Sequence, residues 1–102
     1  MHVIAKSTLR EFWQKHADVE EALQAWHTEA NAAKWTCFQD IKREFGSADC
    51  LPGNRVVFNI KGNSYRLIVV VHYNAAKVYI RFVGTQGAID SGADGQLSKR
   101  TS

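Results

Sequence analysis

The sequence has no acidic residue between Cys50 and Ile89, although five basic residues lie in that stretch. They are Arg55, Lys61, Arg66, Lys77 and Arg81. Residues 1–50 carry six Lys or Arg against eight Asp or Glu, a net charge of −2, whereas residues 51–102 carry seven against two, a net charge of +5. A basic half without compensating acids is typical of a domain that binds a polyanion, and nucleic acid is the commonest one.

The chain also lacks the features that metal centres, disulfide scaffolds and membrane spans require. Its two cysteines, Cys37 and Cys50, have no metal-ligand spacing, so we expect no metal or cofactor and two reduced, partly buried thiols, as in a bacterial cytosol. The longest apolar run, residues 67–71, is too short to span a bilayer, and residues 1–6 lack a signal-peptide core. We therefore expect a cytoplasmic protein without membrane contact.

A length of 102 residues allows one domain, and the periodic patterns end near Thr85. Residues 86–102 hold three of the seven glycines and only two aliphatic side chains larger than alanine, Ile89 and Leu97. Such a segment has little to bury. The sequence therefore predicts a single domain over residues 1–85 and an atypical, flexible tail over residues 86–102.

The first half predicts amphipathic helices. Apolar residues at i, i+3, i+4 and i+7 indicate a helix ending near His16, and a second helix begins with a capping-box pattern at Asp18 and Glu21. Thr36 starts a third, shorter helix. The tryptophans lie on the apolar stripes of these segments, so we expect them in the core or against a partner protein: Trp13, Trp26 and Trp35.

After Pro52 the period changes from 3.6 to 2, which predicts three antiparallel strands over residues 55–60, 65–73 and 77–83. Two-residue turns between them would set Asn59 opposite Arg66 and His72 opposite Lys77. They would likewise set Val57 opposite Ile68, Val70 opposite Tyr79, Ile68 opposite Arg81 and Leu67 opposite Phe82.

Strand alternation sorts this predicted sheet into an apolar face and a basic face. The apolar face, which the helices must cover, comprises Val56, Phe58, Ile60, Tyr65, Leu67, Val69, Val71, Val78, Ile80 and Phe82. The other face carries all five basic residues of the acid-free stretch, together with Val57, Asn59, Ile68, Val70, His72 and Tyr79. Val57, Ile68 and Val70 are too apolar to be exposed to water, so we expect a terminal helix, a partner protein or RNA to cover them.

Four segments resemble the HigB family of bacterial toxins. They are Met-His-Val-Ile (1–4), Asp-Ile-Lys-Arg-Glu-Phe (40–45), Arg-Val-Val-Phe-Asn-Ile-Lys-Gly-Asn-Ser-Tyr-Arg-Leu-Ile-Val (55–69) and Lys-Val-Tyr-Ile-Arg-Phe-Val-Gly-Thr (77–85). The resemblance covers residues 1–85, and the hairpin is its most specific part.

The resemblance implies an α+β, RelE-like fold, with two to three amino-terminal helices on one face of a three- to four-stranded antiparallel sheet. It implies an endoribonuclease that cuts messenger RNA in the ribosomal A site on the other face and so inhibits translation. The implied partner is a HigA-like antitoxin with a helix-turn-helix. The toxin would associate with DNA only indirectly, through this antitoxin.

Metal-independent RNA cleavage needs cations that stabilise the phosphorane-like transition state. We expect Lys61, Arg66 and Arg81 to serve as catalytic residues because the strands would hold them on one surface. Further residues are candidates for RNA binding: Arg55, Asn59, Asn63, Lys77 and Tyr79. For Tyr79, cross-strand packing is an equal alternative, and His72 is expected to be a surface histidine.

The chain departs from the family pattern after Thr85, where the family continues into His-Ala-x-Tyr-Asp. Here Gln86 stands at the histidine position and Ile89 at the tyrosine position, so the acid and base are not identified and Lys61 or a substrate group would have to serve. Two interpretations therefore stay open: the chain is an attenuated toxin, or it is an inactive protein that binds antitoxin or RNA. A merely solvated basic face and an RNA-binding module unrelated to toxins stay open as well.

Overall fold

The computed structural model describes residues 1–62 and 64–85, which form an α+β domain as predicted. A short 3₁₀ helix, Ala17–Val19, joins the first two α-helices. The elements in chain order are β1 (His2–Ile4), α1 (Lys6–Lys15), α2 (Glu20–Ala32), α3 (Phe38–Glu44), β2 (Asp49–Leu51), β3 (Arg55–Ile60), β4 (Tyr65–His72) and β5 (Lys77–Thr85).

The strands form one five-stranded sheet in the order β1-β5-β4-β3-β2. The three long strands were predicted, whereas β1 and β2 were not, because each has only three residues and so shows no usable period. The strand β1 runs parallel to β5, and the remaining pairs are antiparallel. The sheet is therefore larger than the three to four antiparallel strands that we expected.

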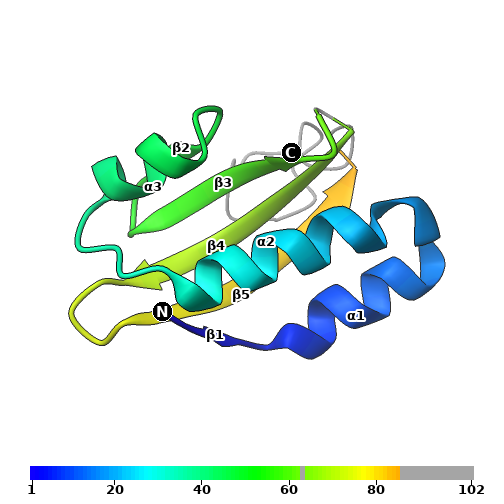
Figure 1. Cartoon of the computed structure of the whole chain (residues 1–102), viewed down its shortest axis with the longest axis horizontal. Coiled ribbons are helices and arrows are strands. Elements are labelled where there is room, and N and C mark those ends of the chain that lie inside the picture. Colours follow the sequence, from blue (N-terminus) through cyan, green and yellow to red (C-terminus); the bar gives the residue numbers. More distant parts are fainter. Residues whose placement is uncertain (63, 86–102) are drawn as a thin grey trace.

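Helices α1 and α2 lie side by side across one face of the sheet, and α3 lies beside β2 and β3 (Figure 1). Their apolar stripes pack against the strands in one core, in which Leu9, Leu23 and Leu67 have no exposed surface. All three tryptophans are buried there, at 9% exposure or less. Phe58 of β3 is central, since its ring centroid lies 5.3 Å from that of Trp26 and 5.1 Å from that of Phe45. One face of the sheet is thus covered by the helices and forms the hydrophobic core with them.

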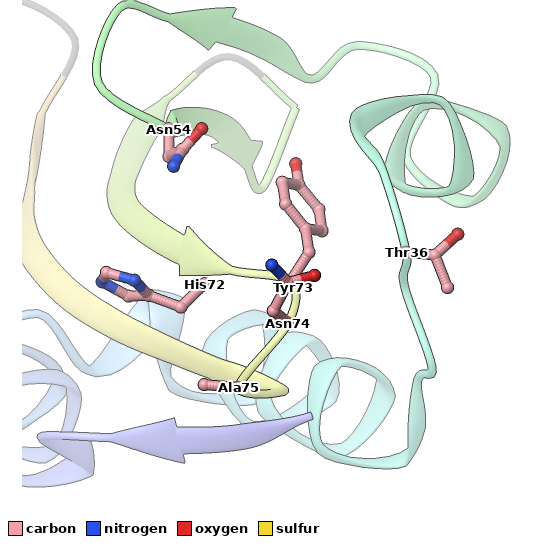
Figure 2. A pocket seen from close by; sticks show the side chains of 6 residues that line it. All are labelled: Thr36, Asn54, His72, Tyr73, Asn74 and Ala75. Carbon is pink, nitrogen blue, oxygen red and sulfur yellow. The ribbon is translucent and has the colours of Figure 1, made fainter.

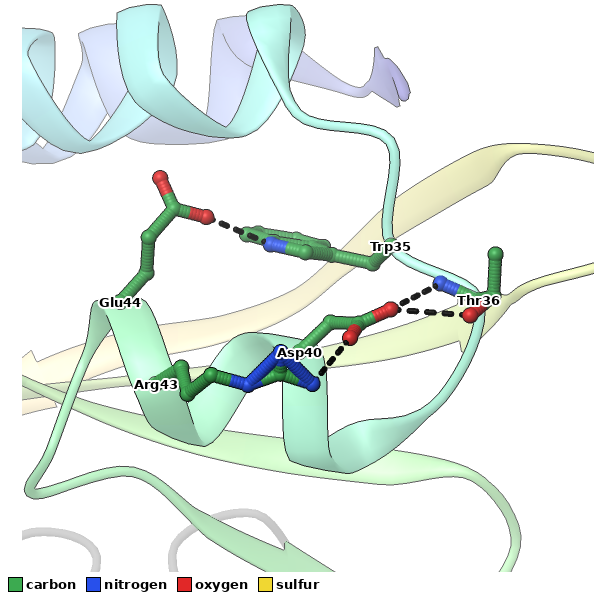
Figure 3. A network of polar contacts seen from close by, with 5 residues as sticks. All are labelled: Trp35, Thr36, Asp40, Arg43 and Glu44. Atoms are coloured by element: carbon green, nitrogen blue, oxygen red, sulfur yellow. Dashed lines mark hydrogen bonds and ion pairs between the residues drawn. The ribbon is translucent and has the colours of Figure 1, made fainter.

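A carboxylate orders the start of α3, as Figure 3 shows. Asp40 accepts hydrogen bonds from the backbone N–H and the hydroxyl of Thr36, both at 2.9 Å, and from the Arg43 guanidinium at 2.8 Å. The bonds from Thr36 hold the pKa of Asp40 below its usual range. Beside them, the indole N–H of Trp35 donates to Glu44 at 2.7 Å. This network anchors α3, and with it the segment that leads into β2.

The predicted register is correct for β3 with β4 and, between β4 and β5, for the second half of β4, from His72 opposite Lys77 to Val69 opposite Ile80. For residues 65–68, which precede Val69 in β4, it is wrong. A β-bulge inserts Arg81 into β5, so Phe82 and not Arg81 lies opposite Ile68. The bulge turns Phe82 to the face opposite the helices, and there Phe82 packs with Val57 and Ile68. Val83 takes the position in the main core that was predicted for Phe82. The prediction of Phe82 in the main core is therefore corrected.

Two other predictions meet the structure here. Both cysteines are free, but Cys37 and Cys50 are exposed and not partly buried. Within residues 1–62 and 64–85, no helix is long and apolar enough to cross a membrane. Asn63, Gln86 and the predicted tail lie outside the described residues.

Candidate nucleic-acid interface

The face of the sheet opposite the helices, called the open face here, carries four of the five cations of the acid-free stretch. It is made by the strand residues that alternate away from the core, plus the two residues at the bulge. They are Arg55, Val57, Asn59, Arg66, Ile68, Val70, His72, Lys77, Tyr79, Arg81 and Phe82. No Asp or Glu occurs in β3, β4 or β5, so these strands contribute no carboxylate to the open face.

Arg66, the second residue of β4, lies at one end of this face. It pairs with Asn59 of β3 on one side and with Gly84 of β5 on the other. The ring of Phe82 lies over Gly84, because a Cβ placed there would come within 2.7 Å of the ring. Glycine is therefore required for this close approach, and a half-buried arginine, an amide and an aromatic ring meet in one small area.

Arg55 and Arg81 lie in the middle of the open face and line a common hollow of ≈ 400 Å³ with Pro52, Gly53 and Val70. The bulge gives Arg81 its place here, since it occupies the extra position between Ile80 and Phe82. The Nε–H of Arg55 donates to the carbonyl of Pro52 at 3.0 Å, which orients its guanidinium. Two permanent cations at one hollow are suited to bind phosphate.

Lys77 and His72 face each other at the far end of the open face. His72 is exposed, as expected, and its ring meets that of Tyr79 edge-on at 5.1 Å. Tyr79 pairs with Val70 in the predicted register and is half-buried. Arg66 and His72 are six positions apart on β4, so the face extends over about 20 Å between them.

The structure does not bring Lys61 to this face, which corrects the prediction. Lys61 follows β3 in a left-handed conformation (φ 53°), and its ammonium binds the carboxylate of Asp18 at 3.0 Å, in the 3₁₀ helix between α1 and α2. The hydroxyl of Tyr65 donates to the same carboxylate at 3.0 Å. Asp18 therefore ties the hairpin to the helices and makes no side-chain cap for α2, contrary to the capping-box prediction.

An apolar strip interrupts the basic residues. Val57 and Ile68 are buried at 9% and 0% exposure, and the half-buried side chains of Leu51 and Phe82 pack against them. We expected cover for Val57, Ile68 and Val70, and the bulge supplies part of it by turning Phe82 to this side. Sequence reasoning missed Phe82 because its position depends on a bulge, and no residue type in β5 signals one.

This arrangement can bind a single-stranded polyanion along the sheet. The cations match phosphates, the aromatic rings of Tyr79 and Phe82 match bases, and strands hold all of them on a rigid surface. Among the described residues, no group of three or more His, Cys, Asp or Glu side chains comes together as metal ligands.

Comparison with protein families gives a match over most of the chain. Residues 19–90 match the family model of the HigB toxin, described as the RelE-like toxic component of a toxin-antitoxin system. The match covers more than half of the chain and includes the helices α2 and α3 and the strands β2 to β5. No curated protein sequence matches the chain. The chain therefore belongs to the HigB family of RelE-like toxins, whose members act opposite an antitoxin.

Proposed function

We propose that this toxin is an endoribonuclease that cleaves messenger RNA on the ribosome, in the A site, and thereby inhibits translation in the cytoplasm. Membership of the RelE-like HigB family carries this proposal. The open face supports it, because four cations lie there on strands that contain no carboxylate. A HigA-like antitoxin with a helix-turn-helix would be the partner, and DNA would be met only through it.

In the proposed reaction the ribose 2′-oxygen attacks the adjacent phosphorus, and the bond from phosphorus to the 5′-oxygen breaks. The products are a 2′,3′-cyclic phosphate and a free 5′-hydroxyl, so the 2′-hydroxyl loses a proton and the leaving 5′-oxygen gains one. Arg66 and Arg81 would stabilise the charge that develops on the phosphoryl oxygens. Arg55, Lys77, Asn59 and Tyr79 would hold the RNA, and so would Asn63.

Lys61 is not given a catalytic role in this proposal, because its ammonium binds Asp18 on the helical side. The groups that move the protons are also not assigned to described residues. In the family a histidine follows the Gly-Thr pair, and here Gln86 stands in its place. Glutamine has no proton to exchange at neutral pH, so we expect slower cleavage than a histidine-bearing relative would give.

The test compares two arginine substitutions during induced expression in a bacterial host. Arg66→Ala removes a cation from the open face, whereas the control Arg10→Ala removes an exposed one from α1. We expect the wild type and Arg10→Ala to stop growth and cut ribosome-bound messenger RNA, also with EDTA added to the isolated ribosomes. Arg66→Ala should cleave on the order of 100-fold more slowly. Intact RNA with the wild-type chain would refute the proposal.

The second candidate function is a protein that binds antitoxin or RNA without cleaving it. The sequence favours it at two positions, Gln86 and Ile89, where the family has histidine and tyrosine. The double substitution Gln86→His with Ile89→Tyr tests it, since restoring both groups should then make a harmless chain toxic. If both chains stay harmless at equal expression, loss of these two groups does not explain the inactivity.

A further inference from the structure

A second hollow, of ≈ 330 Å³, lies where β4 turns into β5, and it is lined mainly by polar side chains. Figure 2 shows the six lining residues, Thr36, Asn54, His72, Tyr73, Asn74 and Ala75. Every one except the alanine can form hydrogen bonds through its side chain. None of the described residues that line the hollow carries a carboxylate, so none of them repels an anionic ligand.

Backbone contacts fix the residues that carry the polar groups. Asn54 has a left-handed conformation (φ 61°), and its carbonyl accepts the N–H of Val71 at 2.9 Å, which holds the β2–β3 loop against β4. Asn74 lies in a turn closed by the bond from Ala76 N–H to the Tyr73 carbonyl at 3.2 Å. Both amides are therefore presented from ordered backbone, and Figure 2 shows both among the side chains that line the hollow.

Burial raises the pKa of Tyr73, with smaller contributions from neighbouring acidic groups, so its phenol stays protonated at neutral pH. The hollow thus offers a phenolic donor beside two amides, each with a donor and an acceptor. Such a set matches the hydrogen-bonding edge of a nucleobase, because each base presents donors and acceptors side by side.

The phosphate-binding hollow of Arg55 and Arg81 borders the same loop. Gly53 lines that hollow and Asn54 lines this one, so consecutive residues separate the two. A nucleotide needs a cationic site for its phosphate next to a polar or aromatic site for its base. The two hollows stand in that relation: the hollow of Arg55 and Arg81 lies in the middle of the open face, and the hollow of Asn54 and His72 lies toward the end remote from Arg66.

We propose that the hollow of Asn54, His72 and Asn74 binds one unpaired base of the RNA whose phosphates lie against Arg55 and Arg81. This inference rests on the proposed function, since it assigns part of the RNA to one site. The two amides select the base through its hydrogen-bonding edge, and the exposed ring of His72, braced by Tyr79, gives it an aromatic contact. The base bound here influences where along the messenger the toxin cuts.

The test uses uncleavable 2′-O-methyl RNA of about eight nucleotides, a length in the range of single-stranded binding sites. One set of oligonucleotides lacks a single base at each position in turn while keeping every phosphate. The variant is Asn54→Gly with Asn74→Ala, because glycine suits the left-handed backbone of residue 54. Asn74→Ala alone is the second variant, at an exposed turn position, and Asn31→Ala on the exposed side of α2 is the control.

We expect one abasic position to weaken wild-type binding roughly tenfold in a fluorescence anisotropy titration. The double variant should bind intact RNA about as weakly as the wild type binds that abasic RNA, and removing the same base should not weaken its binding further. The affinity of Asn74→Ala should lie between those of the wild type and the double variant, and Asn31→Ala should match the wild type. Unchanged sensitivity to the abasic position in the variants overturns the base site and leaves the proposed function standing. A wild-type chain that binds and cuts no RNA overturns both.

Discussion

The two faces of the sheet are formed by the same strands but differ in what lies against them. On one face, helices cover a continuous core that includes Phe58, Leu67 and Val71, and these residues have almost no exposed surface. On the open face Val57 and Ile68 are the buried apolar side chains among the described residues, within a surface of four cations and polar groups. Apolar burial is the main source of folding stability, whereas cations on strands that contain no carboxylate favour binding of an anion.

The comparison therefore divides stability from function. Substitutions on the covered face should lower the free energy of unfolding, and substitutions of open-face cations should change RNA binding at unchanged stability. The bulge at Arg81 is where the two roles meet, since it delivers Phe82 to the open face and Val83 to the core. A variant that changes the free energy of unfolding and RNA binding together would show that its residue, like those at the bulge, contributes to both faces.

The largest effect is expected from Phe58→Ala, which removes the ring between Trp26 and Phe45. The cavity should lower the free energy of unfolding by about 3–5 kcal/mol, measured by urea unfolding followed by circular dichroism. The matched control is Phe82→Ala on the open face. Its half-buried ring should cost less, roughly 1–3 kcal/mol. Equal losses for the two variants would contradict the division between the faces.

Much of this comparison could be predicted from the sequence, because alternation along β3, β4 and the start of β5 fixes which residues share a face. Arg55, Arg66 and Lys77 could be assigned in this way, since a slip by one residue would bury arginines. Phe82 could not, because a single inserted residue in β5 reverses the alternation after it without any sequence signal.

Lys61 shows a second limit of the sequence pattern. It lies in the turn, outside the strand, so alternation no longer decides where its side chain points. Its partner Asp18 is 43 positions away, and no local pattern links the two. The hollow at Asn54 and Asn74 has the same origin, since it joins two loops that only the strand pairing brings together.

A smaller effect is expected for the contact that joins the hairpin to the helices. Hydrogen bonds from Lys61 and Tyr65 hold the pKa of Asp18 below its ordinary value of 3.8. Because the folded-state pKa is the lower one, this contribution to stability is complete above the ordinary value and is lost as the pH falls through the lowered pKa. Asp18→Asn should therefore be less stable than the wild type near neutral pH, and the difference should shrink in acid.

Urea unfolding midpoints measured between about pH 7 and pH 2.5 check this dependence, since that range spans the ordinary pKa of aspartate. Asp40 also has a lowered pKa, but it is present in both chains and so cancels in the difference. A stability difference that is constant over the whole range would show that the carboxylate charge of Asp18 is not what ties the hairpin down.

The smallest expected effect is on the salt dependence of RNA binding. It distinguishes the open-face cations from Lys61, which lies outside that face. Each phosphate neutralised on single-stranded RNA contributes about −0.7 to the slope of log affinity against log salt concentration. Arg55→Ala should therefore make the slope shallower by about 0.7, whereas Lys61→Ala should leave it unchanged because Lys61 is held by Asp18 on the helical side. The slopes come from anisotropy titrations of the uncleavable RNA at about 50 to 300 mM salt. An equal change for both variants would mean that Lys61 leaves Asp18 to bind a phosphate, and that the RNA extends past the end of the sheet onto the hairpin turn.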